Sequence, residues 1–179
     1  MKSFTLKQSL MSMLFLLMST TFLFAQNNQP PASPAATASG KIGDATVTIT
    51  YSSPAVKGRE VWGGLVPYDK VWRAGANQAT ILETTQAIQV EGKNLPAGKY
   101  SLFMLPTENN SWTVILNSQT GQWGILRTGE ANLDRSNDVL TASVKPVKSS
   151  SMHERLVYEV NANGFSLSWD NLTIPVSVK

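Results

Sequence analysis

The feature that most constrains the fold is a short alternation of apolar and polar residues that recurs from residue 45 to the end of the chain. In the first such segment Val47, Ile49 and Tyr51 alternate with three threonines, which is the period of a strand with one buried face. Further strands are predicted at residues 79–85, 87–90, 99–105, 112–117, 139–147, 155–161, 165–169 and 172–178. No window keeps a helical period over three turns, so a parallel α/β fold is excluded.

Turn sequences separate these segments at the spacing of about 8 to 12 residues that is typical of sandwiches. Glu91-Gly92 and Asn163-Gly164 place a glycine where a tight hairpin needs positive φ, and Asp170-Asn171 is a third turn sequence. A hairpin is predicted between residues 99–105 and 112–117, and the polar residues 129–138 are predicted to form a loop or one helical turn. The fold class is therefore all-β, an antiparallel β-sandwich or a jelly-roll-like fold of eight or nine strands with little helix.

The start of the chain has the order of a secretory signal peptide. Lys2 and Lys7 precede an apolar stretch at residues 10–24, which Ala25 and a polar run follow. The stretch is shorter than the roughly 20 apolar residues of a membrane span. We therefore expect residues 1–25 to be removed, and the mature protein to be periplasmic or extracellular without a transmembrane span; a retained anchor is the alternative.

Residues 26–40 consist of small and polar residues with four alanines and three prolines, and they include no large apolar side chain. Such a segment buries too little apolar surface to offset the entropy of ordering it. It is predicted to be a flexible linker, and residues 41–179 are predicted to form a single β-sandwich domain.

Composition excludes several classes of function. The 179 residues include no cysteine, which rules out disulfides, thiolate zinc sites and thiol nucleophiles, and the single histidine rules out any site with two imidazoles. The net charge is +3, and it falls to +1 without Lys2 and Lys7. A chain so close to neutral gives no electrostatic reason to expect a nucleic-acid partner. No metal and no cofactor is predicted.

Catalytic motifs are missing as well. His153-Glu154 resembles part of a zinc-hydrolase motif, but Val157 stands where the second histidine would be needed. No serine lies in a Gly-x-Ser-x-Gly sequence, and no glycine loop continues into Gly-Lys-Ser/Thr. We therefore predict no catalytic residues and expect a protein that is not an enzyme. The alternative is a hydrolase whose carboxylates converge, with Glu60, Asp69 and Glu83 as candidates.

The segment from residue 51 to residue 85 concentrates aromatic, cationic and amide side chains among glycines and prolines. Aromatic planes and guanidinium groups on loops are suited to a sugar or a carboxylate. The predicted ligand-binding residues are Lys57, Arg59, Trp62, Tyr68, Trp72, Arg73, Asn77 and, from a later segment, Trp123. In the alternative interpretation, Trp62 and Trp72 fill the end of the sandwich and Arg73 hydrogen-bonds loop carbonyls.

Several sequence blocks in this segment and after it carry a resemblance to a family. They are Tyr51-Ser52-Ser53-Pro54, Lys57-Gly58-Arg59, residues 62–68, residues 71–77, residues 95–103, residues 112–117, Gln122-Trp123-Gly124 and residues 167–170. With these blocks the chain resembles the domain of unknown function 2911 family of secreted bacterial proteins, over about residues 41–179. The resemblance implies an exported protein and supplies no agreed catalytic residues.

These observations favour one function over two alternatives. The first expectation is an exported, non-catalytic binding module for a small polar ligand, either a glycan or a carboxylate-bearing envelope component. The alternatives are the hydrolase described above and a structural module that binds an envelope protein partner. An exposed apolar patch or an open edge strand would mark the partner-binding module.

Overall fold

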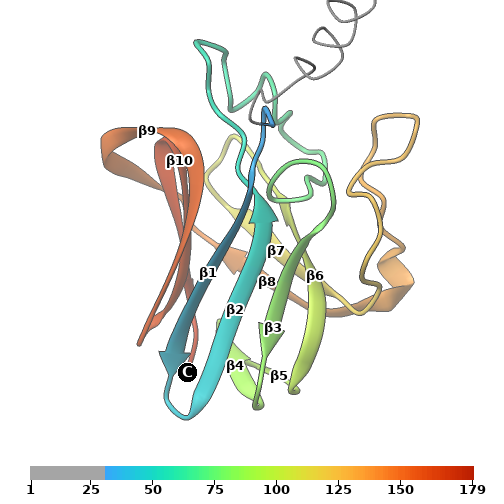
Figure 1. Cartoon of the computed structure of the whole chain (residues 1–179), viewed down its shortest axis with the longest axis vertical. Coiled ribbons are helices and arrows are strands. Elements are labelled where there is room, and N and C mark those ends of the chain that lie inside the picture. The colour runs from blue at the N-terminus through green and yellow to red at the C-terminus, as the bar shows by residue number, and fades with distance from the viewer. Residues whose placement is uncertain (1–30) are drawn as a thin grey trace, which may run out of the picture. The chain divides into compact units, whose positions relative to one another are not determined.

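The structure is a computed structural model that describes residues 31–179 (Figure 1). The predicted signal peptide at residues 1–25 and the start of the predicted linker lie outside the described residues. Between residues 31 and 179 no helix is long and apolar enough to cross a membrane.

The larger of two layers is a six-stranded antiparallel sheet with the strand order β1-β2-β3-β6-β7-β8. Its strands are β1 (Ala35–Ile42), β2 (Ala45–Ser52), β3 (Thr80–Thr84), β6 (Gly98–Leu105), β7 (Trp112–Asn117) and β8 (Asp138–Val144). The alternation in β2 is confirmed, since Val47 and Ile49 are fully buried while Thr46, Thr48 and Thr50 are not. The predicted hairpin is β6–β7, in which Leu102 is paired with Leu116.

The second layer consists of β9 (Val147–Asn161), β10 (Gly164–Ser177), β4 (Ile88–Val90) and β5 (Lys93–Leu95). The two hairpins β9–β10 and β4–β5 are joined because Val178, just after β10, is paired with Val90 in β4. Side chains from both layers form one apolar core, for example Val47 and Leu116 from the first and Leu167 from the second. The expected all-β antiparallel fold is confirmed, and the architecture is sandwich-like.

Strand β10 reverses direction within its own length. A straight strand would separate Gly164 from Val176 by roughly 40 Å, yet the Val178 N–H donates to the Asn163 carbonyl at 3.0 Å. The reversal lies at Asp170, which has a φ of 52°. This is the position of the predicted turn, so β10 contains both strands that were predicted for residues 165–178.

The described residues form ten strands, where eight or nine were predicted. Besides β1, the strand that was not foreseen is β5, which has only three residues. The polar segment at residues 129–138 contains a single turn of 3₁₀ helix, Arg135–Asn137, in agreement with the expected helical turn.

The expected linker at residues 26–40 is wrong for residues 35–40, which form most of β1. All eight residues of β1 are paired with β2, so backbone hydrogen bonds stabilise a segment whose small side chains bury little surface. Ala36 and Ala38 pack against the core. At Gly40 a Cβ atom would lie 2.8 Å from the Val160 carbonyl oxygen, so the small side chains allow β1 to approach β9 closely.

Buried Tyr158 connects the second layer to the loop before β3. Its hydroxyl donates to the Ala74 carbonyl at 2.9 Å, and its backbone N–H donates to the Tyr51 hydroxyl at 3.2 Å. Burial, with a smaller contribution from Tyr51, raises the pKa of Tyr158 well above its ordinary value.

We expect the raised pKa to make the protein less stable in alkali. Above about pH 10 the tyrosine of the unfolded chain loses its proton while folded Tyr158 keeps it, so the unfolded state binds fewer protons and the free energy of unfolding falls. The contribution approaches about 1.4 kcal/mol per pH unit. Urea denaturation between about pH 9 and 12 should give a shallower fall for Tyr158→Phe than for the wild type. Equal slopes would contradict the prediction.

Candidate functional site

Two long connections carry the candidate site. The first comprises residues 53–79 and links β2 to β3, and the second comprises residues 118–137 and links β7 to β8 (Figure 1). Their backbones are hydrogen-bonded to each other: the Ala79 N–H donates to the Gln122 carbonyl at 3.2 Å, and the Gly124 N–H donates to the Asn77 carbonyl at 3.0 Å. The two connections are therefore held side by side.

Both connections cover the outer face of the large sheet. Phe103 and Ile115 point away from the main core and form, with Ala79, a second cluster of buried residues. Partly buried side chains from the first connection (Val71) and from the second (Leu133) pack against this cluster. Because successive side chains of a strand alternate between faces, β6 and β7 can bury residues on both sides.

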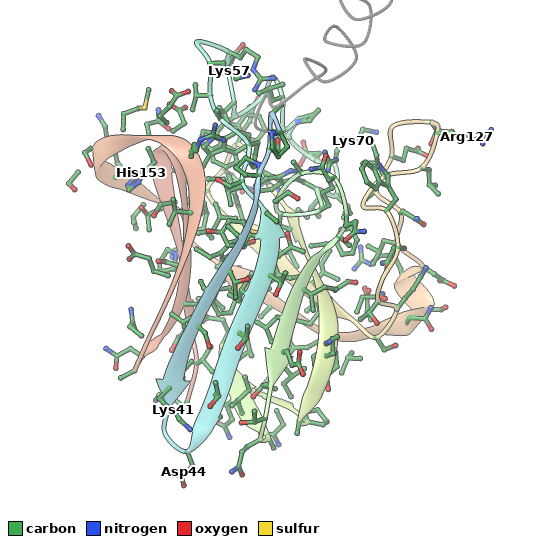
Figure 2. All side chains as sticks on the ribbon, in the orientation of Figure 1. Lys41, Asp44, Lys57, Lys70, Arg127 and His153 are labelled. Atoms are coloured by element: carbon green, nitrogen blue, oxygen red, sulfur yellow. The ribbon has the colours of Figure 1, made fainter. Side chains whose placement is uncertain are left out.

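A cleft of about 700 Å³ lies between the two connections. In Figure 2, Lys70 lies on the first connection and Arg127 at the outer tip of the second. The side chains that line the cleft are mostly apolar, with five charged residues among them: Leu65, Pro67, Asp69, Lys70, Val71, Trp72, Arg73, Ile125, Leu126, Thr128, Gly129, Glu130, Ala131, Leu133 and Arg135.

Arg73 is the charged side chain whose environment is most unusual. Its Nε atom is buried and has no hydrogen-bond partner among residues 31–179. The ion pairs within this part of the chain are Lys99–Glu83 and Arg135–Asp138, so Arg73 is unpaired although Asp69 and Glu130 line the same cleft. Burial lowers the pKa of the Arg73 guanidinium, but arginine stays protonated throughout the ordinary pH range.

Gly124 fixes the position of the Arg73 side chain. A Cβ atom at residue 124 would lie 2.1 Å from Arg73 Cδ and 2.9 Å from Arg73 Cβ. The apolar stem of Arg73 therefore packs directly on the backbone of the second connection. Only a glycine leaves room for this contact.

Three of the predicted ligand-binding residues make hydrogen bonds within the protein, Arg59 and Asn77 through their side chains and Lys57 through its backbone. Arg59 donates from Nε to the Val56 carbonyl at 3.0 Å and from a terminal nitrogen to the Ala55 carbonyl at 2.6 Å. Asn77 donates from Nδ2 to the Ser33 carbonyl and to the Ser52 hydroxyl, each at 3.2 Å. The backbone N–H of exposed Lys57 donates to Glu154.

Trp62 and Trp72 lie in a cluster of four buried tryptophans with Trp112 and Trp169. Trp62 packs edge-on against the other three, and the rings of Trp72 and Trp169 are stacked. This arrangement fits the interpretation in which both residues fill the end of the sandwich, although Trp72 also lines the cleft.

The other two predicted residues differ in exposure. Tyr68 is half-buried and packs against the core, and Trp123 is 54% exposed. Of the eight predicted residues, Trp72 and Arg73 line the cleft. Sequence reasoning missed Leu65 and Leu126. Each is a large apolar residue within a glycine-containing turn, where polar residues are usual, and this feature could have identified them.

The three candidate carboxylates do not share one site. Asp69 lines the cleft, whereas Glu83 on β3 is paired with exposed Lys99 at 3.2 Å, and Glu60 is exposed outside the cleft. Half-buried His153 is paired with Asp170 in the β9–β10 register. Within residues 31–179, no group of three His, Asp or Glu side chains is placed to hold a metal ion.

Comparison with known families agrees with the resemblance inferred from the sequence. The family model described as "Protein of unknown function (DUF2911)" matches residues 33–178. The chain belongs to this family. The DUF2911 match includes β1 and both connections that form the cleft. No curated protein and no solved structure shows significant similarity to the chain.

Proposed function

We propose that this DUF2911 protein is a non-catalytic binding module for a small ligand that carries a carboxylate, and that the carboxylate pairs with Arg73 in the cleft. The observation that carries the proposal is that Arg73 lines the cleft while, among residues 31–179, it has no ion-pair partner and its buried Nε has no hydrogen-bond partner. A buried donor without a partner costs free energy, which a hydrogen-bonding anion would recover. A carboxylate matches the guanidinium fork with two parallel hydrogen bonds.

The arrangement of the aromatic residues favours a carboxylate over a glycan. A sugar is bound by stacking on an accessible aromatic face, but residues Trp62 and Trp72 are each only 8% exposed. Exposed Trp123 is not among the residues that line the cleft. We further propose that the predicted signal peptide exports the protein, so that its ligand is met in the periplasm or outside the cell.

Thermal unfolding of residues 26–179 tests the proposal, because a ligand that binds only the folded state raises Tm. The panel comprises butanoate, benzoate, glucose, N-acetylglucosamine and butylammonium at constant ionic strength. We expect one or both carboxylates to raise Tm in a saturable manner, by an amount that corresponds to about 2.7 kcal/mol at a hundred times Kd. The sugars and the amine should leave Tm unchanged.

Matched variants show whether Arg73 is responsible. Arg73→Met keeps the apolar stem and should abolish the shift, and Gly124→Ala should weaken it because the new Cβ displaces Arg73. Arg127→Met removes the same charge from an exposed position outside the cleft lining and should keep the shift. A shift that survives Arg73→Met would refute the site. A flat panel with folded protein would favour the alternative of a module that binds an envelope protein partner.

A further inference from the structure

Two large apolar side chains are exposed in the cleft. Leu65, from the first connection, is 42% exposed and Leu126, from the second, is 45% exposed. Single exposed leucines are common on protein surfaces. Here two of them line one cleft together with half-buried Arg73, whose Nε has no partner among residues 31–179, so the cleft offers both apolar contact and a positive charge.

The backbone holds both leucines in place. In the first connection the Leu65 N–H donates to the Glu60 carbonyl at 3.0 Å and the Val66 N–H donates to the Val61 carbonyl at 2.8 Å. The turn is tight, since a Cβ atom at Gly64 would lie 2.5 Å from the Glu60 carbonyl oxygen. The exposure of Leu65 is therefore set by a closed turn.

Leu126 is held in the same way. Its N–H donates to the Glu130 carbonyl at 2.8 Å, and its carbonyl accepts from the Gly129 N–H at 3.0 Å. Gly129 has a φ of 88°, which glycine adopts without strain. A leucine fixed in such a turn cannot fold back onto the core, so its apolar surface is available to a ligand.

Other residues of the cleft lining are also apolar. Val71, Ala131 and Leu133 line the cleft and pack against the buried cluster on the outer face of the sheet. Of the charged residues in the lining, Arg135 is paired with Asp138, and Glu130 accepts a hydrogen bond from Thr128. Asp69 and Lys70 are exposed, so half-buried Arg73, whose Nε has no partner among residues 31–179, is the cation best enclosed by the cleft.

We infer that the ligand of the cleft is an unbranched aliphatic carboxylate, with its acid group on Arg73 and its chain between Leu65 and Leu126. The inference rests on the proposed function and adds to it the chemistry of the ligand's body. The alternative ligand, a peptide whose C-terminal carboxylate pairs with Arg73, is an outcome of the test.

Isothermal titration of residues 26–179 with acetate, butanoate, hexanoate and octanoate at constant ionic strength tests the inference. Each added methylene that leaves water should tighten binding roughly three- to fourfold. Octylammonium and octan-1-ol, which lack the anion, should not bind measurably. N-acetyl-leucine and an acetylated tripeptide ending in leucine should bind more weakly than octanoate.

Leucine variants separate the chain from the acid group. Leu65→Ser and Leu126→Ser should flatten the dependence on chain length, so that the affinity for octanoate falls much more than the affinity for acetate. Val139→Ser is the matched control because Val139 lies on β8, outside the cleft lining, and is similarly exposed at 42%. This variant should change neither the dependence on chain length nor the affinity for any of the carboxylates.

The outcomes distinguish the two proposals. Binding that depends on Arg73 but not on chain length would overturn the aliphatic ligand and keep the proposed carboxylate site. Tighter binding of the tripeptide than of octanoate would overturn the aliphatic ligand in favour of a peptide. If no carboxylate binds, the proposed function fails and the inference fails with it.

Discussion

Trp62→Ala is expected to lower the free energy of unfolding by about 3–5 kcal/mol, which is a large share of the 5–15 kcal/mol that stabilises a typical domain. The Trp62 ring centroid lies 5.0 Å from that of Trp112 and 5.8 Å from those of Trp72 and Trp169. Its removal leaves a cavity that these rings cannot close. Urea denaturation measures the loss. A change within about 0.5 kcal/mol would instead indicate a surface residue, as expected of one that only binds ligand.

Phenylalanine variants refine this prediction. The Trp62 Nε1–H is buried and has no partner among the described residues, whereas the Trp72 Nε1–H donates to the Gly75 carbonyl at 3.2 Å. Trp62→Phe removes an unsatisfied donor, and Trp72→Phe leaves a buried carbonyl without this donor. We therefore expect Trp72→Phe to cost about 1 kcal/mol more than Trp62→Phe. The reverse order would contradict the assigned hydrogen bonding.

The strands were predictable because their apolar residues follow local patterns. In β2 the alternation of Val47 and Ile49 with threonines marks one buried face, whereas β6 and β7 bury residues on both faces and are marked by nearly continuous apolar runs. Strand β1 carries no such signal. It is stabilised by pairing with β2 and by the close approach of Gly40 to Val160, and both depend on residues distant in the sequence.

The candidate site was only partly predictable for a related reason. The sequence shows that Arg59, Arg73 and Asn77 are polar loop residues, but not which of them hydrogen-bond their own loop. In the structure Arg59 donates to carbonyls of its own connection and Asn77 donates to Ser33 and Ser52 outside it, whereas Arg73 Nε has no partner among residues 31–179. Leu126 lies on the second connection, about 50 residues after Arg73 in the sequence. The position of this connection beside the first follows from backbone hydrogen bonds such as that from Gly124 to Asn77.

Gly164→Ala is expected to be the most damaging glycine substitution, with a loss of about 3 kcal/mol or more in the free energy of unfolding. A Cβ atom at this position would lie 2.0 Å from the Val176 carbonyl oxygen and 2.9 Å from the Val178 backbone nitrogen. Both atoms belong to the backbone, so no side chain can move aside. The end of β10 would have to shift, which would break the Val178–Asn163 hydrogen bond and the pairing with Val90.

Gly92→Ala separates this clash from the effect of backbone conformation. Gly92 also has a positive φ, 76°, but a Cβ atom there would meet nothing within 4 Å. Its replacement should therefore cost only the 1–2 kcal/mol or so of placing an alanine in a left-handed conformation. Urea denaturation of both variants, with amide exchange at Val178 as a local measurement, tests the comparison. If the two cost the same and Val178 stays protected, β10 does not double back as closely as the contacts at Gly164 require.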